Sequence, residues 1–149
     1  MPDPTSLRLT LPSIRAAREA GIDPARIVAE ACRRARAVKG IFTALVPTAE
    51  AVGRAEALAQ RARAGEDLPL LGVPFAVKDN IHVAGMATTS NCPALSIMPE
   101  ETAQAVQRLE RAGAVLIGKN TMDQFATGLN GTRSPEPLCR NAVDPAYIP

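Results

Sequence analysis

The chain has 149 residues and a formal net charge of +2, and 46% of its residues are hydrophobic, which is enough apolar material for the core of one ordinary domain. Aromatic residues make up only 3%, so the stacking surfaces of a nucleic-acid-binding protein are not expected. No apolar run approaches the roughly 18 residues that cross a bilayer, and the first residues lack the basic start and apolar core of a signal peptide. We therefore expect a cytoplasmic protein that binds neither nucleic acid nor membrane.

Cysteine and histidine are too few and too scattered for a disulfide framework or a metal site. Cys32, Cys92 and Cys139 form no C-x-x-C pair, and an odd count predicts reduced thiols in a reducing compartment. His82 is the single histidine, which excludes a multi-histidine metal centre, and we expect it in a surface loop.

The first third of the chain has the pattern of packed helices. We expect one helix from about Pro12 to Ala20, a second that begins at Asp23-Pro24, and a third at 48–64. Asp23 can cap the free N–H groups of the second helix, and Pro24 tolerates its first position. The buried side of that helix is predicted to hold Ile27, Val28, Ala31, Cys32, Ala35 and Val38.

From Leu70 onward the pattern changes to alternating strands and helices. Buried strands are expected at residues 73–78 and 114–118, in addition to a short apolar strand at 42–46. A helix between the two longer strands argues for parallel pairing. The predicted fold class is α/β, with N-terminal helices followed by the start of a mixed, mostly parallel sheet flanked by helices.

The helices of this second part are predicted from amphipathic spacing and capping. The segment 102–112 places Val106 and Leu109 on its inward face. A further helix is expected from Thr121, because Gln124 follows it in capping-box spacing.

Two segments lack periodicity. Residues 79–101 are rich in small, turn-forming side chains, and loops of this length in a compact domain are usually functional. Residues 131–149 hold four prolines and end beside what we expect to be an unfinished sheet. We divide the chain into a helical region at 1–67 and the first part of an α/β core at 68–149, and we expect that core to be truncated.

The run GAVLIGKNT at 113–121 contains the spacing G-x-x-x-x-G-K of a phosphate-binding loop. Such a loop needs turning residues whose N–H groups converge on the phosphate. Residues 114–117 are instead Ala, Val, Leu and Ile, and Asn120 stands where a serine or threonine is required. We interpret this run as a buried strand that ends in a polar turn.

The run GVPFAVKDNI at 72–81 places a lysine at the end of an apolar strand. Ligands of α/β sheets bind at the carboxyl ends of the strands, where Lys78 is expected. Burial there would disfavour the ammonium form and allow the amine to act as a base. The alternative is a lysine that reaches into water or pairs with Asp79, and composition alone favours that alternative.

Two longer runs resemble a known family. LLGVPFAVKDNIHVAGMATTSNCPAL is very similar to the segment that bears the catalytic lysine in the amidase signature family. RLERAGAVLIGKNTMDQFATGLNGTRSP resembles the next block of that family, and its DQFATGL-GTRSP part is most similar to allophanate hydrolases. The strong resemblance covers residues 68–147.

The resemblance implies cleavage of an amide by a serine–serine–lysine triad. Lys78 would take a proton, through a bridging serine in a cis peptide, from a second serine that attacks the carbonyl. Backbone N–H groups of a glycine-rich segment would stabilise the oxyanion. In the family both serines follow the point at which these 149 residues end, and Ser90, Ser96 and Ser134 do not stand in the pattern.

The resulting hypothesis is an amide hydrolase most similar to allophanate hydrolase, which releases ammonia and carbon dioxide in urea and s-triazine breakdown. The resemblance implies no metal or organic cofactor, a small allophanate-like amide as substrate, and association as a homodimer or with a complementary chain. These residues alone are expected to be inactive, because they carry the base without the nucleophile.

Three alternatives stay open. A biuret-type or general amidase, or the glutamyl-tRNA amidotransferase component of the same family, would share the lysine block. A non-catalytic truncated or split fragment would bind a complementary chain that supplies the serines. A plain structural α/β domain would require Lys78 to be solvated and the segment 79–101 to be disordered.

Overall fold

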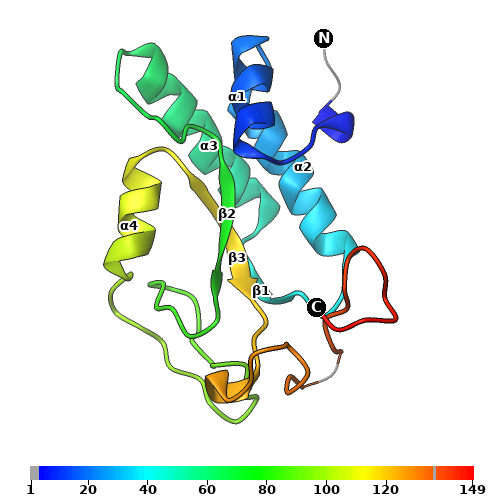
Figure 1. Ribbon diagram of the computed structural model, residues 1–149. Helices are drawn as coiled ribbons and strands as arrows, with labels where there is room; N and C mark the ends of the chain where they lie inside the picture. The colour runs from blue at the N-terminus through cyan, green and yellow to red at the C-terminus, as the bar shows by residue number, and fades with distance from the viewer. Residues whose placement is uncertain (1–3, 136) are drawn as a thin grey trace. The chain divides into compact units, whose positions relative to one another are not determined.

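The computed structural model describes residues 4–135 and 137–149 (Figure 1). The chain forms two compact units whose segments interleave along the sequence. The unit that we call the helical unit consists of Met1–Arg34, Val46–Phe75 and Gln107–Ile117. The unit that we call the loop unit consists of Ala35–Leu45, Ala76–Val106 and Gly118–Pro149.

The three strands form one sheet in the order β1-β3-β2. Their bounds are Phe42–Leu45 for β1, Pro74–Lys78 for β2 and Val115–Asn120 for β3. β1 is antiparallel to β3. β2 and β3 are parallel, because the N–H of Val115 donates to the C=O of Val73 at 2.8 Å and the N–H of Asp79 donates to the C=O of Asn120 at 3.1 Å. The predicted mixed α/β sheet is confirmed, with one pairing of each kind.

The helical unit begins with three helices whose starts the sequence predicts. Their bounds are Leu11–Glu19 for α1, Pro24–Ala37 for α2 and Thr48–Arg63 for α3, after a short 3-10 turn, η1, at Pro4–Ser6. The N–H of Ala25 donates to Oδ1 of Asp23 at 2.8 Å, so Asp23 caps α2 as expected. Thr10 caps α1 in the same manner, accepting from the N–H of Ser13.

The core of the helical unit comes from apolar side chains at helical spacing. Ile14, Ala17, Ile22 and Ile27 are buried together, and Leu7, Leu9 and Val73 pack against them. α3 buries Ala51, Ala55, Leu58 and Ala59 on one side. The removal of this apolar surface from water is the main force that stabilises the unit.

Two predicted core residues lie at the surface. Val38 is 48% exposed, because α2 ends one residue earlier, at Ala37. Leu109 is 37% exposed, although it lies in α4 (Gln104–Arg111), where Val106 is buried as predicted.

The loop unit contains little regular structure beyond the strands. Residues 79–101 carry two isolated bridges, Val83 with Met86 and Thr88 with Ile97. The predicted helix from Thr121 is wrong, because only a 3-10 turn, η2 at Gln124–Ala126, forms there. Phe125 has a φ of 53°, in the left-handed region, where a regular helix cannot continue.

β1 and β3 approach each other closely in the loop unit. A Cβ atom added at Gly118 would lie 2.5 Å from the carbonyl oxygen of Ala44, so only glycine fits at this point of β3. Among the residues that the structure describes, no helix has the length and apolar character needed to span a membrane.

Candidate active site at the strand ends

Lys78 is the last residue of β2 and is exposed. Val77 before it and Asp79 after it are buried, as expected for side chains that alternate between the two faces of a strand. Within residues 4–135 and 137–149, no carboxylate forms an ion pair with the Lys78 ammonium. The predicted place of Lys78 is confirmed, but these residues do not supply the burial that a neutral lysine base requires.

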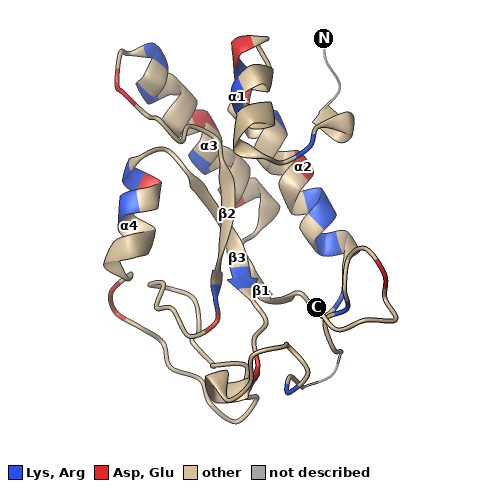
Figure 2. Ribbon diagram, in the orientation of Figure 1, with Lys and Arg blue, Asp and Glu red and all other residues tan. Residues whose placement is uncertain are grey.

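Asp79 pairs with Lys119 and not with its sequence neighbour. Asp79 is 1% exposed and Lys119 is 0% exposed, and Nζ of Lys119 lies 3.4 Å from Oδ1 of Asp79. Figure 2 shows basic residues at the ends of β2 and β3 and an acidic residue directly after β2. Burial lowers the pKa of Lys119, and the negative charge of Asp79 opposes that effect.

The Lys119 ammonium also holds the segment after β2. Its Nζ donates to the carbonyl oxygen of Ala87 and to Oγ1 of Thr88, both at 2.8 Å. Two of the three ammonium donors are thus hydrogen-bonded, and the ammonium also forms an ion pair with Asp79.

The second oxygen of Asp79 holds the next two residues of the same segment. Oδ2 accepts from the hydroxyl of Thr89 and, at 2.9 Å, from the N–H of Asn91. The side-chain amide of Asn91 donates to Oγ1 of Thr121 at 2.9 Å and to the carbonyl oxygen of Met122. The ends of both strands and residues 87–91 therefore form one hydrogen-bonded network. Of the two conditions for a plain structural domain, Lys78 is exposed as that alternative requires, whereas residues 87–91 of the segment 79–101 are held by hydrogen bonds.

Asp123 organises the loop that follows β3. Its carboxylate accepts three backbone N–H groups, from Arg133 at 2.7 Å, Gly131 at 3.1 Å and Asn130 at 3.2 Å. The bond from the Arg133 backbone contributes most to lowering the pKa of Asp123, and burial opposes it. The predicted helix is lost here because the chain folds back to supply these donors.

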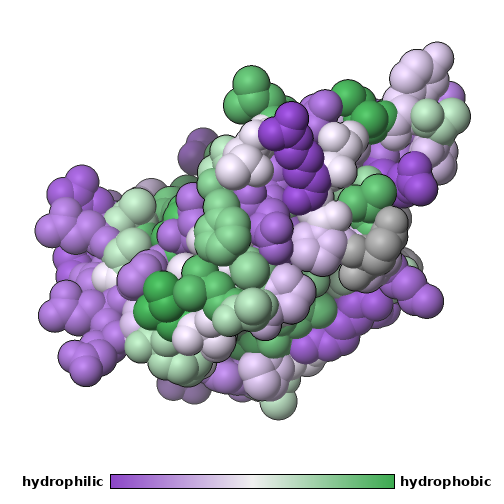
Figure 3. Space-filling view, turned by 90° about the horizontal axis from the view of Figure 1, so that it is seen from below, coloured by the Kyte–Doolittle hydropathy of each residue, from purple (hydrophilic) through white to green (hydrophobic). Residues whose placement is uncertain are grey.

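A cavity of about 290 Å³ opens beside the network in the loop unit. Thr43, Thr89, Asn91 and Thr121 provide its polar side chains, and Phe42 is among its apolar lining residues. The same unit exposes large apolar side chains, including Met98, Leu129 and Val143. The view from below in Figure 3 shows such apolar patches between polar ones.

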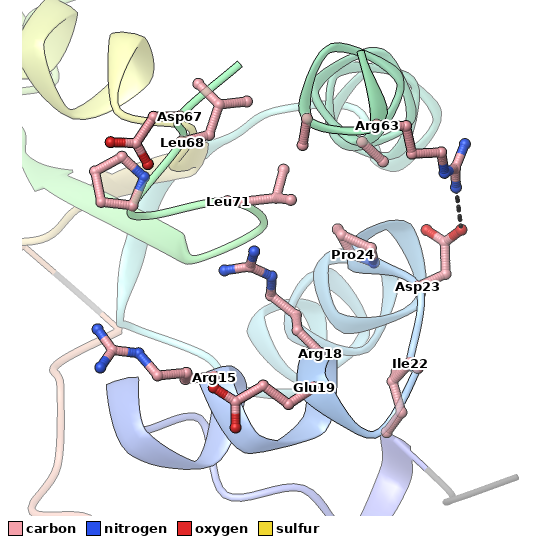
Figure 4. A pocket seen from close by; sticks show the side chains of 14 residues that line it. Arg15, Arg18, Glu19, Ile22, Asp23, Pro24, Arg63, Asp67, Leu68 and Leu71 are labelled. Atoms are coloured by element: carbon pink, nitrogen blue, oxygen red, sulfur yellow. Dashed lines mark ion pairs between the residues drawn. The ribbon is translucent and has the colours of Figure 1, made fainter. Parts of the chain in front are cut away.

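A second cavity, of about 670 Å³, lies within the helical unit (Figure 4). The charged side chains that line it carry both signs: Arg15, Arg18 and Arg63 against Glu19, Asp23 and Asp67. Arg63 already pairs with Asp23 at 3.6 Å. No group of three His, Cys, Asp or Glu side chains that could hold a metal occurs anywhere in the described part of the chain. This cavity therefore suggests no chemistry.

Of the remaining candidates from the sequence, His82 and Ser96 are exposed. Ser134 donates to the carbonyl oxygen of Met122, which also accepts from the Asn91 amide, and Ser90 lies between Thr89 and Asn91, where its carbonyl oxygen accepts from the N–H of Phe125. The cysteines form no disulfide in the described residues. The run at 113–121 contains strand β3, so the rejection of a phosphate-binding loop is confirmed.

Sequence reasoning missed the buried partner of Asp79. The sequence predicts Lys119 in a polar turn, whereas it lies inside β3 and is completely buried. A signal was present, since a buried strand that runs into a lysine needs a carboxylate nearby. Asp79, at the end of the adjacent strand, is the residue that could have been named.

Comparison with known proteins identifies the family of this chain. A family model described as amidase matches residues 26–149. The chain belongs to the amidase family. Urea amidolyase of Saccharomyces cerevisiae is 56% identical over 70 residues, which cover 47% of this chain and 4% of that protein. A glutamyl-tRNA(Gln) amidotransferase component of Deinococcus radiodurans is 38% identical over 136 residues, which cover 91% of this chain and 28% of that protein.

Part of a solved structure has the same fold as this chain. The allophanate hydrolase of Kluyveromyces lactis superposes with a TM-score of 0.75 and 34% identity, over 95% of this chain and 24% of that one. The α/β fold and the membership in the amidase signature family are thus as the sequence predicted. The chain spans 4% to 28% of the lengths of these three relatives.

Proposed function

We propose that this chain supplies the lysine base of a serine–serine–lysine amide hydrolase, and that Lys78 is that base. The observation that carries the proposal is the position of Lys78, which is exposed at the carboxyl end of β2 within the segment matched by the amidase family. Its amine has no carboxylate partner in the described residues, so it is available to another group.

Catalysis on this proposal needs groups beyond the described residues. A lysine removes a proton efficiently only when it is neutral, which requires burial or a nearby positive charge. A polypeptide segment that carries the two serines would cover Lys78 and remove it from water. Lys78 would then accept the proton of the bridging serine, which in turn takes the proton of the attacking serine.

We propose allophanate as the first substrate to test. Similarity to urea amidolyase and to an allophanate hydrolase supports this choice, together with the DQFATGL-GTRSP part of the sequence. A second candidate is amide transfer by a glutamyl-tRNA amidotransferase, because a component of such an enzyme aligns with 91% of this chain. Ammonia release from allophanate and from glutamine, measured side by side, separates the two.

The role of Lys78 as the base is tested by comparing two lysine variants in an enzyme assembled from two polypeptides, which we call the complemented enzyme. Ammonia release is measured for the 149-residue chain alone and after mixing it with the part of the K. lactis allophanate hydrolase that follows the matched segment. We expect release only from the mixture, and we expect Lys78→Ala to abolish it. Lys39→Ala, at an exposed position, is the matched control and should keep activity.

Two outcomes count against this proposal. Turnover by the chain alone that Lys78→Ala abolishes would show that no additional serine segment is needed. Undiminished turnover of the Lys78→Ala variant would show that Lys78 is not the base.

Partners and location are part of the same proposal. A complementary polypeptide that supplies the serines, or a second copy of the chain, is expected to associate with it, and co-purification from the native source tests this. We propose a cytoplasmic location, because the odd count and the scattered spacing of the cysteines favour reduced thiols.

A further inference from the structure

Lys119 is an unusual buried group. It is the largest side chain that is completely buried in the described residues, and its ammonium donates two hydrogen bonds and forms an ion pair with Asp79. A buried charge is tolerated only when it is paired and hydrogen-bonded. A strand end could be closed with an apolar residue at lower cost, so the retained charge needs a reason.

Asp79 is the buried partner of Lys119 and directly follows Lys78 in the chain. Its two oxygens face the interior of the loop unit, one toward Lys119 and one toward Thr89 and Asn91. Asp79 is 1% exposed, whereas Lys78, directly before it, is exposed. The negative charge beside Lys78 is therefore neutralised on the opposite side of the chain.

We propose that Lys119 and Asp79 are positioning residues for Lys78: Lys119 holds the Asp79 carboxylate inside the loop unit and so prevents it from pairing with the Lys78 amine. This inference rests on the proposed role of Lys78 as a base. A carboxylate that paired with Lys78 would keep it an ammonium ion, which cannot accept a proton. The buried pair thus leaves the base unpartnered before any serine arrives.

The chain offers a direct test, because it contains only three lysines, Lys39, Lys78 and Lys119. An acetylating ester modifies neutral amines, and mass spectrometry of the digested chain gives the rate at each lysine. In the native protein at fixed mild alkaline pH, we expect Lys78 and Lys39 to react and Lys119 to be protected.

Variants of the pair should change the Lys78 rate in opposite directions. Lys119→Met leaves the Asp79 charge uncompensated near Lys78. The acetylation of Lys78 should slow about threefold, because a nearby negative charge favours the ammonium form. Asp79→Asn leaves the Lys119 charge uncompensated and should raise the acetylation rate of Lys78 by a similar factor. The Lys39 rate is the internal control and should stay constant.

Two more variants separate charge from structural damage. Lys119→Arg keeps the charge and should leave the Lys78 rate near that of the native chain. The double variant Asp79→Asn/Lys119→Met removes both charges. The acetylation rate of Lys78 should therefore lie close to its rate in the native chain. Circular dichroism and the constant Lys39 rate identify the variants that are folded.

Several results would overturn the inference. One is acetylation of Lys119 as fast as that of Lys39 in the native chain. Another is a pair of single variants that change the acetylation rate of Lys78 in the same direction. A third is a folded Lys119→Met variant in which the acetylation rate of Lys78 is unchanged. Because the readout needs no turnover, a failed amidase assay would overturn the role of Lys78 without affecting this measurement.

Discussion

The ends of β2 and β3 place the same residue type in opposite environments. Lys78 ends β2 in solvent with no carboxylate partner in the described residues, whereas Lys119 lies one residue before the end of β3 and is completely buried. Each lysine is followed within a few residues by a buried aspartate, Asp79 or Asp123, that accepts hydrogen bonds from a loop. The local sequence patterns are alike, so the difference comes from what packs against each strand end.

The end of β3 is enclosed by other parts of the chain, whereas the end of β2 is open. β3 lies between β1 and β2 in the strand order. Near its end, Lys119 forms an ion pair with Asp79 and donates hydrogen bonds to residues 87 and 88. β2 is at the edge of the sheet. We expect the lysine in the enclosed place to stabilise the fold, and we propose the lysine in the open place as the one that takes part in chemistry. Four predictions test this division.

The largest effect is expected at the enclosed lysine. Lys119→Met leaves the Asp79 carboxylate buried without its cation, and we expect the free energy of unfolding to fall by roughly 3–5 kcal/mol. Urea denaturation followed by circular dichroism measures it. Lys39→Met, at an exposed site, should change it by less than about 0.5 kcal/mol. Equal effects of the two variants would mean that the pair does not stabilise the fold.

The close approach of β1 and β3 predicts the next effect. Gly118→Ala puts a Cβ atom 2.5 Å from the Ala44 carbonyl oxygen, so the strands must separate, at a cost of about 1–3 kcal/mol. Gly53→Ala is the matched control, because nothing lies within 4 Å of its added Cβ. Because Gly53 lies in α3, Gly53→Ala should raise the free energy of unfolding by about 0.5–1 kcal/mol. A destabilising Gly53→Ala together with a neutral Gly118→Ala would contradict this packing.

The loop after β3 should depend on pH through Asp123. Its pKa is lowered in the folded state, chiefly by the hydrogen bond from the Arg133 backbone, so its contribution to stability is complete above the ordinary pKa and is lost as pH falls through the lower, folded value. Asp123→Asn should lower the urea midpoint at pH 7, and the deficit should shrink below about pH 4. Glu100→Gln, at an exposed site, is the control. A deficit that stays constant down to acid would show that the charge is not involved.

The smallest effect on stability is expected at the open lysine. Lys78→Ala removes an exposed side chain that makes no ion pair in the described residues, and the free energy of unfolding should change by less than about 0.5 kcal/mol. The same substitution should abolish ammonia release by the complemented enzyme. A loss above about 1 kcal/mol would indicate that Lys78 is structural, as Lys119 is.

Much of the fold could be predicted because short-range physics decides it. Asp23-Pro24 marks the start of α2, and the apolar spacing from Ile27 places most of its buried side correctly. The strands at Pro74–Lys78 and Val115–Asn120 follow from apolar, β-branched runs. Capping spacing alone failed at Thr121, because the Asp123 carboxylate offers the backbone of residues 130–133 an alternative to a helix.

The sequence by itself determined the α/β class, the helix starts, and the place of Lys78 at the end of a strand, since each depends on residues within a few positions of one another. Only the tertiary structure decided which lysine is buried. Lys119 and Asp79 are separated along the chain by α4, most of β3 and the loops around them, yet they form one ion pair at 3.4 Å. The energy of a charge depends on its burial and on its partners, and both are set by strands that meet in space.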